Sequence, residues 1–220
     1  MPTQLGVVLF GDVVHSRRWP RPTADWLEQL CRELDADYSA EQLAGFEFTQ
    51  GDEIQGLLAP SADPFRAVLS AALRPSAEVP QMRWAVVAGA VDPGSGPATR
   101  RSGPAFVTAR ATINLARHQK DTLLVRTGHE PSDALLDGTA PVLGSLFVRL
   151  SDRQREIARL SLIDGLRQSE IADRLHVRPA TISVAFARAD VRSLARLLAA
   201  VRALWSRTMR EIQPVGSPDG

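Results

Sequence analysis

The order of apolar and amphipathic segments in residues 1–92 constrains the fold of this chain more than any other feature of the sequence. Continuous or alternating apolar runs predict strands, apolar residues at helical spacing predict helices, and Gly51-Asp52 predicts a tight hairpin turn. The expected elements are a strand at 6–14, a helix at 23–37, strands at 46–50 and 54–58, a helix at 64–73 and a strand at 83–91.

This βαββαβ order is the arrangement of ferredoxin-like palm domains, so the predicted fold class is α/β (α+β). Right-handed crossovers place the first strand beside the third and antiparallel to it. Asp12 at the end of the first strand and Asp52 at the start of the third then lie together, with Glu53 next in the chain. Carboxylates at one sheet edge suit a Mg²⁺ or Mn²⁺ ion that holds nucleotide phosphates. A hairpin turn beside an unrelated acidic residue is the alternative.

The last third of the sequence contains residues that typically begin and end helices, which predicts several consecutive helices. Ser151 followed by Gln154 makes a capping box, and Gly165 ends the first helix. A second short helix is expected at 168–175, and Pro179, at a first helical position, opens a third. Two short helices joined by so short a turn have the spacing of a DNA-binding helix-turn-helix.

Charge divides the chain between these two regions. Residues 149–220 contain 13 arginines against 8 acidic residues, whereas residues 1–148 contain 13 basic and 17 acidic residues. A cationic segment joined to an acidic one indicates a polyanion partner, and double-stranded DNA is the expected one. We predict an α/β domain at 1–148, an all-α helix-turn-helix domain at 149–212 and a disordered tail at 213–220.

A further apolar stripe follows the third of these helices. Leu194, Leu198, Val201 and Trp205 belong to a series at i, i+3, i+4 and i+7 spacing, which predicts one long amphipathic helix. The stripe needs a partner, which is either the helix-turn-helix of the same chain or the same helix of a second chain. The second alternative makes the protein a homodimer.

Hydropathy and cysteine content exclude several classes of protein. No apolar run approaches the roughly 18–20 residues that cross a bilayer, and the N-terminus leads directly into a strand-like segment. The expected location is therefore the cytoplasm, without a membrane partner. Cys31 is the only cysteine, which excludes an intrachain disulfide and a thiolate zinc site.

Three segments, VVLFGDVVHS, FTQGDEIQGLL and one that ends in ATINLAR, occur in the order found in class III nucleotidyl cyclases, which this region resembles. The resemblance implies that Asp12 and Asp52 bind two metal ions. It also implies a nucleotide-binding set on a later helix, made of Arg110, Asn114 and Arg117.

The same region is more similar to the SatD family. It shares with that family a Gly-Asp strand end followed by Ser, a G-D-E-x-Q-G hairpin, and a G-P-A triplet where a helix begins. Among these motif residues, we expect Gly11, Ser16 and Gln55 at the nucleotide site and Glu53 at the metal site. Some members of the family similarly carry a C-terminal helix-turn-helix.

Residues 150–190 resemble the region 4 modules of sigma factors and the modules of LuxR-like response regulators. The resemblance rests on Glu-Ile-Ala at 170–172, Val177 and Thr-Ile-Ser at 181–183. It implies an inward face made of Ile182, Phe186 and Ala189. It also implies a DNA-binding face made of Arg178, Ala180, Thr181, Ser183, Val184 and Arg188. A module that only packs or dimerises is the alternative.

The expected function is a DNA-binding transcription regulator whose cyclase-like domain senses a nucleotide, a divalent metal ion or both. One alternative is a metal-dependent enzyme that transfers nucleotidyl or phosphoryl groups, with metal ions bound by Asp12 and Asp52. Another is a protein-interaction or dimerisation platform whose carboxylates are vestigial.

Overall fold

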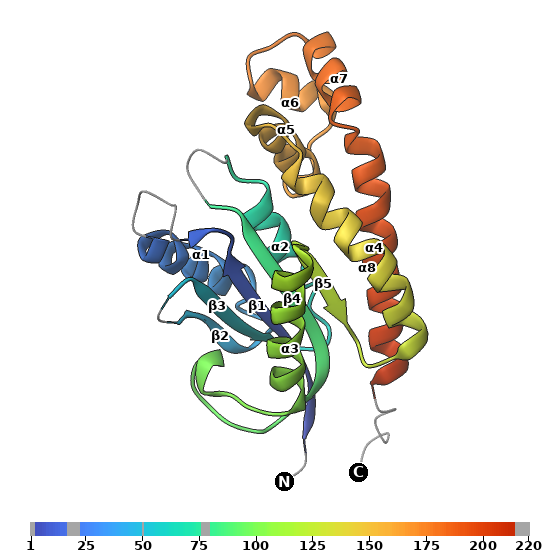
Figure 1. Ribbon diagram of the computed structural model, residues 1–220. Coiled ribbons are helices and arrows are strands. Elements are labelled where there is room, and N and C mark those ends of the chain that lie inside the picture. Colours follow the sequence, from blue (N-terminus) through green and yellow to red (C-terminus); the bar gives the residue numbers. More distant parts are fainter. Residues whose placement is uncertain (1–2, 17–22, 50, 76–79, 214–220) are drawn as a thin grey trace.

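The computed structural model describes residues 3–16, 23–49, 51–75 and 80–213, and it consists of a five-stranded sheet, helices on both sheet faces and a helical extension (Figure 1). The strands are β1 (Gln4–Val13), β2 (Gln42–Phe48), β3 (Glu53–Leu58), β4 (Met82–Val91) and β5 (Leu123–Arg126). The helices are α1 (Thr23–Asp37), α2 (Phe65–Ala72), α3 (Pro104–Gln119), α4 (Glu130–Val148), α5 (Asp152–Leu162), α6 (Gln168–Arg174), α7 (Pro179–Arg188) and α8 (Val191–Ile212), with a short 3-10 turn, η2 (Ala98–Arg100), before α3.

The strands lie in the order β2-β3-β1-β4-β5. β1 is antiparallel to both β3 and β4, and β5 is parallel to β4. The predicted βαββαβ order and the placement of the first strand beside the third are therefore confirmed. Two parts of the predictions, the Gln50 end of the second strand and the tail beyond Gln213, lie outside the described residues.

Both faces of the sheet are buried, which explains the nearly continuous apolar run of β1. Val7 and Leu9 belong to the core that α1, α2, α4 and α8 cover, whereas Val8 and Phe10 belong to the core beneath α3. Successive residues of a strand point to opposite faces, so Asp12 continues the row of Val8 and Phe10. Its side chain therefore lies on the α3 face of the sheet.

The long helix α8 packs on the α/β part of the molecule. It runs antiparallel beside α4 (Figure 1) and is hydrogen-bonded to it through Thr208 and Ser132, whose hydroxyl oxygens are 2.7 Å apart. The Trp205 ring meets the Phe65 ring of α2 edge to face, with centroids 6.0 Å apart. The apolar stripe of α8 is thus buried mainly against α1, α2 and α4 of the same chain. Neither of the two expected partners, the helix-turn-helix or a second chain, is this surface.

Helices α5, α6 and α7 surround a small core of their own, made of Ile157, Leu160, Ile171, Ala172 and Ile182. The capping box of Ser151 and Gln154 is present at the start of α5. Within the described residues, no helix combines the length and the hydropathy that crossing a membrane requires.

Arg155 joins α5 to the α/β part. Its guanidinium donates to the carbonyl oxygens of Ala72 at 2.7 Å, Leu150 at 3.1 Å and Val148 at 3.3 Å. Burial lowers the pKa of this arginine. These three hydrogen bonds fix the position of α5 against α2. If α5 moved away, the buried guanidinium and the carbonyl oxygens that it contacts would lose their hydrogen bonds, which costs free energy.

Candidate functional site

Three charged residues lie side by side across the central strands, on the α3 face of the sheet. Asp12 in β1 is directly opposite Glu53 in β3 on one side and Arg83 in β4 on the other. All three side chains are nearly buried, since no more than 8% of each residue is exposed. A buried charge is tolerated only when it is paired, so this row requires partners of opposite sign.

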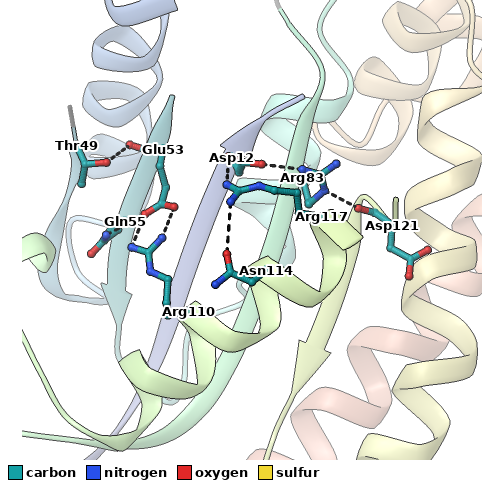
Figure 2. Close-up of polar contacts among 9 residues, drawn as sticks. All are labelled: Asp12, Thr49, Glu53, Gln55, Arg83, Arg110, Asn114, Arg117 and Asp121. Carbon is teal, nitrogen blue, oxygen red and sulfur yellow. Dashed lines mark hydrogen bonds and ion pairs between the residues drawn. The ribbon is translucent and has the colours of Figure 1, made fainter. Parts of the chain in front are cut away.

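Arginines from β4 and α3 pair with both carboxylates (Figure 2). One oxygen of Asp12 accepts from Arg83 and the other from Arg117, each at 2.7 Å. Glu53 forms a bidentate pair with Arg110, whose guanidinium also lies over the Phe10 ring, 4.6 Å from its centroid. Two oxygens facing two N–H groups in parallel fix the orientation of both partners.

Arg83 and Arg117 each make a further hydrogen bond besides the one to Asp12. Arg83 also donates to the carbonyl oxygen of Asp121 at 3.0 Å, and Arg117 donates to Asn114 at 3.4 Å. The hydrogen bond to Asp12 raises the pKa of Arg117, and the charges of Asp52 and Glu53 add to this effect. Arg117 reaches Asp12 from α3 and keeps half of its side chain exposed, whereas Arg83 is enclosed.

A cavity of about 910 Å³ opens beside Asp12, and we call it the Asp12 cavity. Its lining combines the end of β1, the hairpin turn, the start of β4 and the end of α3: Asp12, Val13, Val14, His15, Ser16, Asp52, Gln81, Arg83, Arg117, Lys120 and Thr122. His15 and Lys120 both have left-handed backbone conformations, with φ of 59° and 63°. The lining thus includes three cationic residues and two acidic ones around a volume that is large enough for a small ligand.

The structure brings together some of the residues expected at a nucleotide site and separates others. Asp12, Asp52, Ser16 and Arg117 line the cavity, and the Val13 amide donates to the Asp52 carbonyl oxygen at 2.9 Å. The remaining expected residues do not line the cavity. Glu53, Gln55 and Arg110 pair with one another, and Asn114 is exposed on α3, where it accepts from Arg117. A Cβ at Gly11 would point to the opposite face of the sheet.

The sequence reasoning missed Arg83, Gln81, Lys120 and Thr122. Arg83 carried a usable signal, because it is the only charged residue in the otherwise apolar segment 82–91. A charge in such a segment indicates a buried ion pair. The other three residues sit in loops, and nothing in their spacing distinguishes them from solvent-exposed positions.

The site does not fit the two metal ions that the cyclase resemblance implies. Both oxygens of Asp12 and both oxygens of Glu53 accept from guanidinium groups, so within the described part of the chain Asp52 is the one of these three carboxylates without an arginine partner. Across the residues that the structure describes, no group of three or more His, Cys, Asp or Glu side chains is placed to hold a metal ion. The positive charge that neutralises Asp12 and Glu53 therefore comes from arginine side chains, where the resemblance implied metal ions.

A second surface lies on the helical extension. Helices α6 and α7 are joined by a four-residue turn in which His176 has a left-handed conformation, with φ of 51°. Ile182 faces inward and is fully buried, and Phe186 and Ala189 are half-buried. All six residues expected to contact DNA are exposed: Arg178, Ala180, Thr181, Ser183, Val184 and Arg188. Most of them border a groove between α7 and the start of α5, about 530 Å³ in volume.

A small inner cavity of about 30 Å³ lies between the Asp12 cavity and α5. Gln81 and Thr122 line both cavities, and Arg155 of α5 lines the inner one. The indole nitrogen of Trp84 and the hydroxyl of Thr122 are buried there, and neither has a hydrogen-bond partner among the residues that the structure describes. A volume of this size can hold one or two water molecules, which would satisfy these two polar groups in an otherwise mostly apolar lining.

Comparison with known proteins gives structural neighbours but no family. No protein-family model matches the chain, and no curated protein sequence does. Two solved structures of a bacterial light-regulated adenylyl cyclase each align with 57% of this chain at 15% sequence identity. The first alignment covers 77% of the cyclase chain with a TM-score of 0.42, and the second covers 44% with a TM-score of 0.41.

Proposed function

We propose that the protein is a DNA-binding regulator in which α6 and α7 form a helix-turn-helix and the Asp12 cavity takes a nucleotide as the regulatory ligand. The observation that carries the DNA-binding half is the outer face of α7. Its exposed residues, from Arg178 to Arg188, lie on the side away from the small core, as a helix that enters the major groove requires.

Charge supports the same surface. The segment that contains α5 to α8 carries the arginine excess of the chain, and Arg178 and Arg188 lie at the two ends of the exposed face. Phosphate neutralisation by arginine supplies much of the affinity of such modules for DNA. Ala180, Ser183 and Val184 offer few bidentate contacts to bases, so the preference for one DNA sequence over another is expected to be modest.

The proposal that a ligand regulates DNA binding rests on the residues that connect the Asp12 cavity to α5. Gln81 and Thr122 border the Asp12 cavity on one side and the inner cavity on the other, where Arg155 ties α5 to α2. A ligand that moves these side chains changes the packing under α5, and α5 packs directly against α7. Such a ligand alters DNA affinity only if it binds the two arrangements with different affinity.

The double variant Arg178→Ala, Arg188→Ala tests the DNA-binding half. We expect weaker binding to double-stranded DNA at every salt concentration, and a slope of log affinity against log salt that is shallower by about 2, because each arginine neutralises one phosphate. Fluorescence anisotropy with a labelled duplex at several salt concentrations measures both quantities.

Arg32→Ala is the matched control, because its side chain on α1 is 70% exposed and lies in the acidic part of the chain. It should leave the affinity and the slope unchanged. An unaltered salt slope in the double variant, or no DNA binding by the parent chain at low salt, would remove the DNA-binding proposal.

A further inference from the structure

We infer that the Asp12 cavity binds the phosphate groups of its ligand directly through arginine and lysine side chains, without a divalent metal ion. The inference rests on the proposed function, because it specifies how the regulatory nucleotide is held. Its starting point is the disagreement between the metal-binding role implied for Asp12 and the two guanidinium groups that occupy both oxygens of this carboxylate.

The charge balance of the lining favours an anion. Arg83, Arg117 and Lys120 contribute three positive charges, against the negative charges of Asp12 and Asp52. A Mg²⁺ or Mn²⁺ site needs free carboxylate oxygens in excess of nearby cations. A phosphate site needs the reverse, with N–H donors already held in position.

The geometry holds Arg83 and Arg117 in place, and Arg117 is the one that a ligand can reach. Asp12 and the Asp121 carbonyl hold Arg83, and Asp12 and Asn114 hold Arg117. Each guanidinium has five N–H donors, and its hydrogen bonds to the described residues use two of them. The side chain of Arg117 is 51% exposed, so its remaining donors can meet a ligand that enters the cavity.

In this arrangement Asp12 is a positioning residue. Its carboxylate holds both guanidinium groups at fixed places and offsets part of their charge in a buried setting. The ordering cost of the arginines is thereby met before the ligand binds, which favours affinity. Lys120, at the end of α3, adds a mobile point charge at the rim of the cavity.

The test measures binding of ATP and of inorganic pyrophosphate to the full chain by isothermal titration calorimetry, once in EDTA and once in excess Mg²⁺. We expect binding of at least one probe to persist in EDTA. Arg117→Gln and Lys120→Gln should each weaken that binding, Arg117→Gln by about tenfold or more, because each removes a charged donor. Arg32→Gln on α1 is the control and should bind as the parent does.

Asp12→Asn separates the two modes of binding. The amide keeps an acceptor for an arginine and removes the negative charge, so phosphate binding is expected to persist, whereas a metal site would lose its ligand. If this variant fails to fold, the metal dependence of the parent and the half-exposed Arg117 position still decide the question.

Binding that disappears in EDTA and returns with Mg²⁺ would overturn the inference. So would an unchanged affinity in Arg117→Gln, or no binding of either probe in either buffer. The DNA-binding half of the proposed function is measured on the chain without nucleotide, so its failure is recorded separately from any of these results.

Discussion

Replacement of Trp205 by alanine is expected to lower the free energy of unfolding by about 3–5 kcal/mol, the usual cost of removing a large buried aromatic side chain. Trp205 is 2% exposed and meets Phe65 of α2, which is fully buried. For a chain of this length the loss corresponds to a fall in melting temperature of roughly 6–20 °C. Differential scanning calorimetry and urea unfolding followed by circular dichroism both measure it.

Ser206→Ala is the control, because Ser206 is exposed on the same helical turn and should leave stability nearly unchanged. The Trp205 variant and the parent should each unfold in a single transition that includes the sheet, because residues of α8 and of the sheet belong to the same hydrophobic core. A Trp205 variant as stable as the parent, or an α8 that melts separately while the sheet stays folded, would refute the packing described for α8.

The second large effect is expected from Arg83→Met, which removes the enclosed partner of Asp12. The Asp12 side chain is 3% exposed and would retain only its pair with Arg117. Removing one member of a buried ion pair costs about 3–5 kcal/mol, and we expect the lower end of that range because the second pair remains. Urea unfolding at neutral pH provides the measurement.

Arg117→Met is the matched comparison for Arg83→Met, because both residues pair with the same carboxylate at the same distance. The Arg117 side chain is half-exposed, so water can replace it, and the cost should stay below about 1 kcal/mol. Equal losses of stability in the two variants would contradict the difference in burial on which the description of the site depends.

Local patterns of sequence were sufficient to predict the central strands. The apolar run of β1, the Gly51-Asp52 turn and right-handed crossovers together required β1 to lie beside β3, and the register then placed Asp12 opposite Glu53. The inward side of α7 followed from helical spacing in the same way, with Ile182 buried. These features depend on short-range periodicity, which the sequence carries directly.

The parts that were not predicted depend on weak local signals or on long-range partners. β5 has only four residues, and α4 contains Pro131, Pro141, Gly138 and Gly144, which are residues typical of loops. Gly144 is needed there for close packing, since a Cβ at this position would lie 2.5 Å from the Thr122 hydroxyl. Periodicity gave the apolar face of α8 but could not name the surface that covers it.

The pairing of Asp12 also depends on long-range structure. Arg83 reaches this carboxylate through the register of β4, and Arg117 reaches it through the packing of α3, so the two partners are 71 and 105 positions away in the chain. Sequence reasoning found the carboxylates and inferred a metal ion as their counter-charge. The counter-charge comes instead from the two arginines, which lie next to Asp12 only in the folded chain.

The most direct test of the regulator is the affinity of the full chain for a double-stranded DNA fragment at one fixed salt concentration, with and without a saturating nucleotide. The nucleotide is chosen beforehand as the triphosphate that raises the melting temperature most in EDTA. We expect the affinity for DNA to change by about fivefold or more, with the same factor in the affinity for nucleotide when DNA is present. The same DNA affinity with the Asp12 cavity empty and saturated would contradict a regulatory role for this cavity.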